Sequence, residues 1–149
     1  MTSEPPRDLP RLLSAAERSM TRRLAAALEP ENCSVEEWRV LSLLSDDRGH
    51  TMSDVAEYAL MPAPSLTKLV DRMVSAALVY RRKDPGDGRR VLVYLSTRGR
   101  ARYRRTAALV QGTQEQVLAE LPGVQDLLEG LARLESLLGR DAEQVRAAR

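Results

Sequence analysis

The sequence contains no phenylalanine, and only one tryptophan, one histidine and one cysteine among its 149 residues. A single cysteine excludes an intramolecular disulfide and any metal site built from several thiolates, and a lone histidine gives a metal site little support. No apolar run reaches the length of a signal-peptide core or a membrane span. We therefore expect a cytoplasmic protein that makes no membrane contact and needs no metal or cofactor.

Catalytic motifs are also missing. The chain offers no Ser/His/Asp order, no cluster of metal ligands and no phosphate-binding glycine loop, so we expect no enzymatic activity. Hydrophobic residues make up 43% of the chain, which is enough for one domain with a core. The net charge is only +2, yet residues 81–105 hold ten Lys or Arg and two acidic residues. A basic centre of this kind favours a polyanionic partner.

Residues 51–95 combine two helix patterns with a strand pair. Apolar residues in the second pattern recur at helical spacing: Leu66, Leu69, Val70, Met73, Ala77 and Leu78. This spacing leaves polar side chains that bind phosphates and base edges on the opposite face. The runs VYRRK and VLVYL then flank the turn residues DPGDGRR, which predicts a two-stranded ribbon with a cationic tip. The order of elements is that of a winged helix-turn-helix, the lobe that we assign to residues 34–96.

Long amphipathic helices are expected on both sides of this lobe. Residues 1–8 resemble a flexible tail, and residues 9–149 form a single domain. Within it, residues 9–30 and 97–140 carry apolar stripes longer than a small lobe can bury, so we expect them to form the interface of a homodimer. The fold class is therefore mainly α with a small β wing, with N- and C-terminal dimerisation helices.

The runs SVEEWRVLSLL, MSDVAEYALMPAPSLTKLVDRMVSAALVYRR and DPGDGRRVLVYLSTRGR resemble the MarR family of bacterial winged-helix transcriptional regulators. The DGR of the wing and the segment that follows it carry most of the resemblance, which extends over residues 9–140. It implies a cytoplasmic homodimeric repressor on a pseudo-palindromic double-stranded DNA operator, with recognition helices in major grooves and wings reaching minor grooves. It also implies that Arg89 enters the minor groove and that Asp87 orients it.

The residues expected to bind DNA lie on the recognition helix and the wing tip. They are Pro64, Ser65, Thr67, Lys68, Arg72, Asp87, Arg89 and Arg90. The other arginines of the basic centre are either phosphate contacts or a solvated face, and their position beside a recognition helix favours phosphate. By family resemblance, a small-molecule effector binds between the DNA-binding lobe and the dimerisation helices.

Three alternatives stay open at this point. A winged helix can also serve as a protein-protein interaction module that binds no DNA, although such a module has no need of a basic wing. Trp38 shares a stripe with core residues, which favours packing over a ligand contact. Cys33 is either a redox sensor or a small buried side chain, and its place just before a capping serine favours burial.

Overall fold

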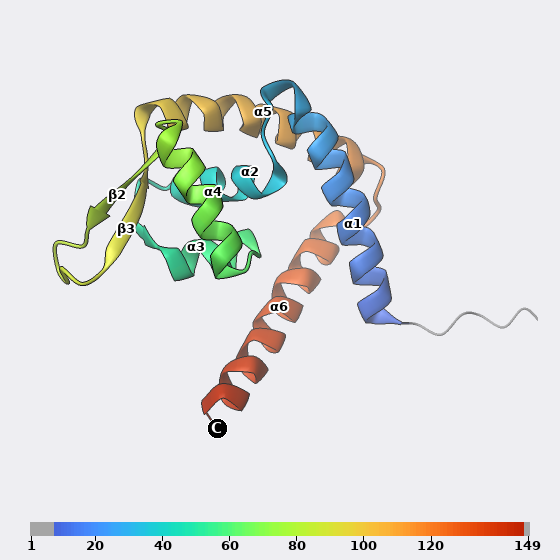
Figure 1. Cartoon of the computed structure of the whole chain (residues 1–149). Coiled ribbons are helices and arrows are strands. Elements are labelled where there is room, and N and C mark those ends of the chain that lie inside the picture. Colours follow the sequence, from blue (N-terminus) through green and yellow to red (C-terminus); the bar gives the residue numbers. More distant parts are fainter. Residues whose placement is uncertain (1–7, 148–149) are drawn as a thin grey trace, which may run out of the picture. The chain divides into compact units, whose positions relative to one another are not determined.

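The computed structural model describes residues 8–147, and the chain divides into two compact units at Thr113, inside helix α5. The first unit begins with α1 (Leu9–Leu28), the short 3-10 turn η1 (Glu29–Glu31), α2 (Val35–Leu44), β1 (His50–Thr51), α3 (Met52–Ala59) and α4 (Ala63–Ser75). It continues with β2 (Val79–Lys83), β3 (Val91–Leu95) and the larger part of α5 (Thr97–Ala119). This order confirms the predicted winged helix-turn-helix (Figure 1).

Short polar side chains set the helix starts. Asp8, which the sequence placed in the tail, is the N-cap of α1 and accepts a hydrogen bond from the N–H of Arg11. Thr51 and Asp54 form a complete capping box at α3. A capping box at α2 is only half formed, because Ser34 accepts from the N–H of Glu37 while the Glu37 carboxylate binds a residue of α5.

The sheet is antiparallel in the order β1-β3-β2. Val79 faces Leu95 and Lys83 faces Val91, so the two predicted strands pair along their whole length. The two-residue strand β1, which pairs with β3 on the other side, was not predicted. Alternation along the strands turns Val79, Val93 and Leu95 into the core.

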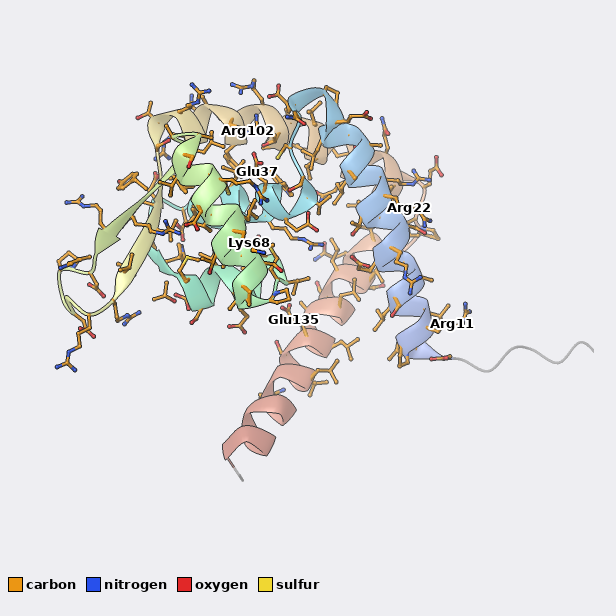
Figure 2. All side chains as sticks on the ribbon, in the orientation of Figure 1. Arg11, Arg22, Glu37, Lys68, Arg102 and Glu135 are labelled. Carbon is orange, nitrogen blue, oxygen red and sulfur yellow. The ribbon has the colours of Figure 1, made fainter. Side chains whose placement is uncertain are left out.

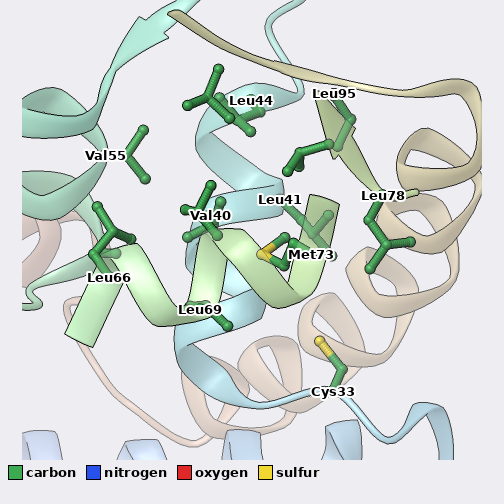
Figure 3. Close-up of a cluster of buried hydrophobic side chains, with 14 of the residues drawn as sticks. Cys33, Val40, Leu41, Leu44, Val55, Leu66, Leu69, Met73, Leu78 and Leu95 are labelled. Carbon is green, nitrogen blue, oxygen red and sulfur yellow. The ribbon is translucent and has the colours of Figure 1, made fainter. Parts of the chain in front are cut away.

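The core of the first unit lies where α2, α3 and α4 meet the base of the wing (Figure 3). Its fully buried members come from all of these elements: Val40, Leu41, Leu44, Val55, Leu66, Val70, Met73 and Val93. Trp38 is half-buried and stacks on Tyr103 of α5, with ring centroids 5.4 Å apart. Cys33 is buried at the edge of the core. Packing was the favoured interpretation of both residues, and the structure confirms it.

The recognition helix is shorter than its apolar pattern predicted. It ends at Ser75, so Ala77 and Leu78 belong to the turn before the wing, where Ala77 has a φ of 57°. Pro64 is the second helical residue, because Ala63 begins the helix after Pro62. The residues expected to face DNA are unaffected by this correction.

The second unit holds the end of α5 and the helix α6 (Val124–Ala147). Leucines at helical spacing along α6 are exposed, among them Leu127, Leu128 and Leu131. In the first unit, α1 likewise exposes Leu9 and Leu12 and buries only Leu28. Across residues 8–147, none of the helices combines the length and apolarity needed to cross a bilayer.

Candidate nucleic-acid interface

Helix α4 presents a polar face to solvent. The apolar residues Leu66, Leu69, Val70 and Met73 are buried against α2 and α3, which leaves the other side of the helix exposed. Of the residues expected to bind DNA, this side carries all those that belong to the helix: Pro64, Ser65, Thr67, Lys68 and Arg72. The Thr67 hydroxyl donates to the carbonyl of Ala63 at 3.0 Å, so its remaining capacity is as an acceptor.

The turn between α3 and α4 sets how α4 is presented. Leu60 caps α3 in the left-handed region, with a φ of 56°, and its side chain is 74% exposed. Met61 donates its N–H to the carbonyl of Ala56 at 3.0 Å, and Pro62 then starts α4 without a side-chain cap. The first N–H groups of α4 therefore point into solvent beside the polar face, where a phosphate oxygen can accept them.

The wing tip is held by hydrogen bonds of its own. Across the tip, Asp84 donates its N–H to the carbonyl of Arg90, and Arg90 donates to the carbonyl of Asp87, both at 2.9 Å. The Asp84 carboxylate accepts from the N–H of Gly86 at 2.9 Å, and the Asp87 carboxylate accepts from the N–H of Arg89 at 3.1 Å. Asp87 thus fixes the backbone that carries Arg89, while the side chains of Arg89 and Arg90 are exposed.

The basic centre does not form one surface. Five of its arginines have acidic partners within the fold. These pairs are Arg81 with Asp71, Arg90 with Asp84, Arg100 with Asp47, Arg102 with Glu37, and Arg105 with Glu31. The sequence interpretation of this cluster as phosphate contacts therefore applies best to members outside these pairs, such as Arg82, Lys83 and Arg89.

Arg102 makes the most buried of these contacts. Its Nε lies 2.7 Å from Glu37 Oε1 and its Nη2 donates to the carbonyl of Asn32 at 2.9 Å. The side chains of Arg102 and Glu37 are only 19% and 16% exposed. Figure 2 shows this pair between α5 and α2, while Lys68 lies on α4. The pair fastens α5 to the start of α2 and is part of the scaffold.

A groove of about 520 Å³ lies between α4, α5 and the start of α2. Four arginines and one glutamate line it together with apolar side chains of α4 and α5: Arg72, Arg98, Arg102, Arg105, Glu37, Leu69, Met73, Ala76, Leu78 and Ala101. Within residues 8–140, the side chains of Arg72 and Arg98 make no hydrogen bond or ion pair. The groove therefore combines unpaired cations with an apolar floor, a combination that suits an organic anion. The sequence alone did not locate it, because its lining comes from segments far apart in the chain.

In the part of the chain that the structure describes, no group of three or more His, Cys, Asp or Glu side chains is placed so that it could hold a metal ion. His50, the lone histidine, is instead paired with Asp46, with Nε2 lying 2.9 Å from Oδ2. The candidate interface consists of the exposed face of α4 and the tip of the wing, which the strands β2 and β3 carry.

Comparison with known proteins agrees with this geometry. The model of the MarR family matches residues 33–90. The chain is 32% identical to the HTH-type transcriptional regulator FarR of Neisseria gonorrhoeae, over 85% of this chain and 90% of that protein. Among solved structures, the transcriptional repressor CouR bound to a 23-mer DNA duplex superposes with a TM-score of 0.73 at 24% identity, covering 87% of this chain and 92% of that one. NadR in complex with 4-hydroxyphenylacetate gives a TM-score of 0.72 at 25% identity, covering 95% and 97%.

Proposed function

The chain belongs to the MarR family of transcriptional regulators, and we propose that it represses its target genes as a homodimer that binds a pseudo-palindromic DNA operator and responds to an organic anion. In this proposal α4 reads base edges in the major groove through Ser65, Thr67, Lys68 and Arg72. Arg89 and Arg90 of the wing tip reach the adjacent minor groove. The two lobes of the dimer bind two half-sites about one helical turn apart.

One observation carries the proposal: the same unit of the chain holds both the exposed polar face of α4 and a hydrogen-bonded wing tip with exposed arginines. Hydrogen bonds hold the backbone of the tip in place, so the Arg89 side chain extends into solvent from a fixed point. A guanidinium in a narrow, A·T-rich minor groove is favoured by the negative potential there. The alternative function, a winged helix that binds only protein, does not require exposed arginines at the wing tip. The likeness to DNA-bound CouR supports the DNA interpretation.

Homodimer formation is supported by the exposed apolar stripes. Leu9 and Leu12 of α1 are 52% and 51% exposed, and Leu127 and Leu131 of α6 are 42% and 41% exposed. Complete transfer of a large apolar side chain out of water contributes about 1.5–3 kcal/mol, so covering each of these half-exposed leucines with a second copy of the chain would contribute about half of that. Two-fold symmetry then accounts for two matching half-sites in the operator.

The effector site that fits this chain is the arginine-lined groove. Arg72 and Arg98 supply unpaired cationic donors, and the apolar floor from Leu69, Met73 and Leu78 suits a hydrophobic body. The complex of NadR with 4-hydroxyphenylacetate supports an effector that carries a carboxylate. A bound anion would shift the population toward lobe positions that do not fit DNA, to the extent that it binds those positions more tightly.

Fluorescence anisotropy with a duplex from the gene's own upstream region, and with an unrelated duplex, tests the proposal. We expect the logarithm of affinity to fall linearly with the logarithm of salt concentration. Lys68→Ala should weaken binding to the upstream duplex by about 1–3 kcal/mol, the value of one base contact. Arg89→Ala should reduce the salt slope by about one.

The matched control is Arg133→Ala, which removes the same charge from an exposed position in α6. It should bind both duplexes as the parent does. Absence of salt-dependent binding to either duplex would contradict DNA binding and favour the protein-interaction module. Equal losses from Arg133→Ala and Arg89→Ala would show that only net charge matters.

A further inference from the structure

An ion pair joins the recognition helix to the wing. The Nη2 of Arg81 in β2 lies 2.6 Å from Oδ1 of Asp71 in α4. Asp71 lies on the exposed side of α4, one turn after Thr67 and Lys68. Arg81 lies two residues after Val79 in β2, so both side chains are on the same face of the sheet, which is turned toward the core and α4. The contact therefore bridges the two parts of the DNA-binding surface.

The chain already connects these parts through the turn between α4 and β2. Ala76 donates its N–H to the carbonyl of Arg72 and Leu78 donates to that of Met73, both at 2.9 Å. These bonds, the pairing of β1 with β3 and the burial of Val79, Val93 and Leu95 fix the base of the wing. A wing held only at its base can still pivot, whereas an attachment further out along β2 restrains its angle to α4. The pair between Asp71 and Arg81 supplies that attachment.

The pair also changes the charge that DNA meets. A free carboxylate at Asp71 would repel phosphates close to Lys68, and a free guanidinium at Arg81 would bind any phosphate without regard to sequence. Pairing cancels both effects. The two side chains are 33% (Arg81) and 58% (Asp71) exposed, so the pair contributes little to folding stability. Its principal effect is on geometry.

We propose that Asp71 and Arg81 are positioning residues that hold the wing at a fixed angle to α4. They thereby set the distance along the duplex between the bases that α4 reads and the minor-groove contact of Arg89. This inference rests on the proposed DNA-binding function. Without the pair, the chain binds DNA but tolerates a changed spacing between the two contacts.

The test starts from a pool of random-sequence duplexes enriched by binding to the parent chain, which yields a preferred duplex. One base pair is then inserted or removed between the segment that α4 covers and the segment that the wing covers, as located by footprinting. The variant is Asp71→Asn. The matched control is Asp47→Asn, which removes the same charge from a side chain of similar exposure, 62%, and breaks the ion pair with Arg100 away from α4 and the wing strands.

The parent and Asp47→Asn should bind the altered duplex about tenfold more weakly than the preferred one, the size of one lost base contact. Asp71→Asn should bind the preferred duplex more weakly than the parent does and discriminate between the two duplexes by less than about threefold. Electrostatics alone predicts the opposite, which is tighter binding to both duplexes after loss of a negative charge. The exchange Asp71→Arg with Arg81→Asp should restore discrimination.

Unchanged discrimination by Asp71→Asn would overturn the positioning role, and so would failure of the exchanged pair to restore it while the chain stays folded by circular dichroism. These outcomes leave DNA binding itself intact. Failure of the parent chain to enrich any sequence would instead overturn the proposed function, and this inference with it. The parent measurement therefore separates the two failures.

Discussion

At the level of single residues, burial determines the reactivity of the Cys33 thiol. Its side chain is buried, and its Sγ donates to the carbonyl of Ser34 at 3.4 Å. Burial and, next, the nearby carboxylate of Glu37 together raise the pKa of the Cys33 thiol to about 12, although the Arg102 guanidinium acts in the opposite direction. A thiol with this pKa holds almost no thiolate at neutral pH, so the structure argues against the redox-sensor alternative.

We predict that Cys33 reacts with iodoacetamide at pH 8 only when the chain is unfolded in urea. Folding should also lose stability as pH rises from about 9 toward 12, because the unfolded thiol ionises near its ordinary value of 9.0 while the folded thiol stays protonated. Below pH 9 this contribution is fully present. Urea unfolding across this range should show a shallower decline for Cys33→Ala than for the parent. Rapid alkylation of the folded chain would contradict the assignment.

The partners of the arginines in α5 could not be predicted from the sequence. A cluster of positive residues beside a recognition helix favoured phosphate contacts, but Arg102 binds Glu37 and Asn32, which lie 65 and 70 residues away in the chain. No local sequence pattern predicts contacts between residues so far apart in the chain. The capping box at Ser34 was half formed for the same reason, since the Glu37 side chain has this distant partner.

At the level of elements, the close approach of α5 to the wing depends on Gly99. This glycine lies in the first turn of α5 and is buried. A Cβ at Gly99 would lie 2.0 Å from the carbonyl oxygen of Leu78, and that oxygen also accepts the N–H of Ser96 at 3.0 Å. Because the obstacle is backbone, the helix or the strand must move to admit a methyl group.

Gly99→Ala should therefore destabilise the fold by about 1–3 kcal/mol, even though alanine favours helix by about 1 kcal/mol. Gly112→Ala is the control in the same helix, because a Cβ there meets nothing within 4 Å. It should stabilise the chain by about 0.5–1 kcal/mol. Urea unfolding followed by circular dichroism measures both changes. A neutral or stabilising effect of Gly99→Ala would mean that α5 and the wing are not packed as described.

Most helices and strands could be predicted because each of them has a local sequence pattern of its own. Apolar residues at helical spacing marked α1 and α4, and turn residues between alternating runs marked β2 and β3. The strand β1 carries no such signal, since it has two residues and exists only through pairing with β3. The exposure of the residues expected to bind DNA on α4 and the wing tip could likewise be predicted from the sequence, and their contact with DNA stays a prediction. The contact between Asp71 and Arg81 and the groove beside Arg72 required the tertiary structure.

For the whole molecule, the central claim is that two copies of the chain present two lobes to one operator. The first unit holds a buried core and the candidate DNA-binding surface, while exposed leucines lie on α1 and, in the second unit, on α6. A single lobe can contact only one half-site, so sequence-specific affinity should depend on the dimer even though the dimer residues lie outside the DNA-binding surface.

Sedimentation of the chain, alone and with a duplex from its gene's upstream region, tests this claim most directly. We predict a species of twice the 16.6 kDa chain mass at micromolar concentration, and two chains on each duplex. Leu131→Asp combined with Leu134→Asp should give a folded monomer that loses specific binding, although both substitutions lie in α6. A parent chain that sediments as a compact monomer, or a monomeric variant that binds the duplex as tightly as the parent, would contradict the claim.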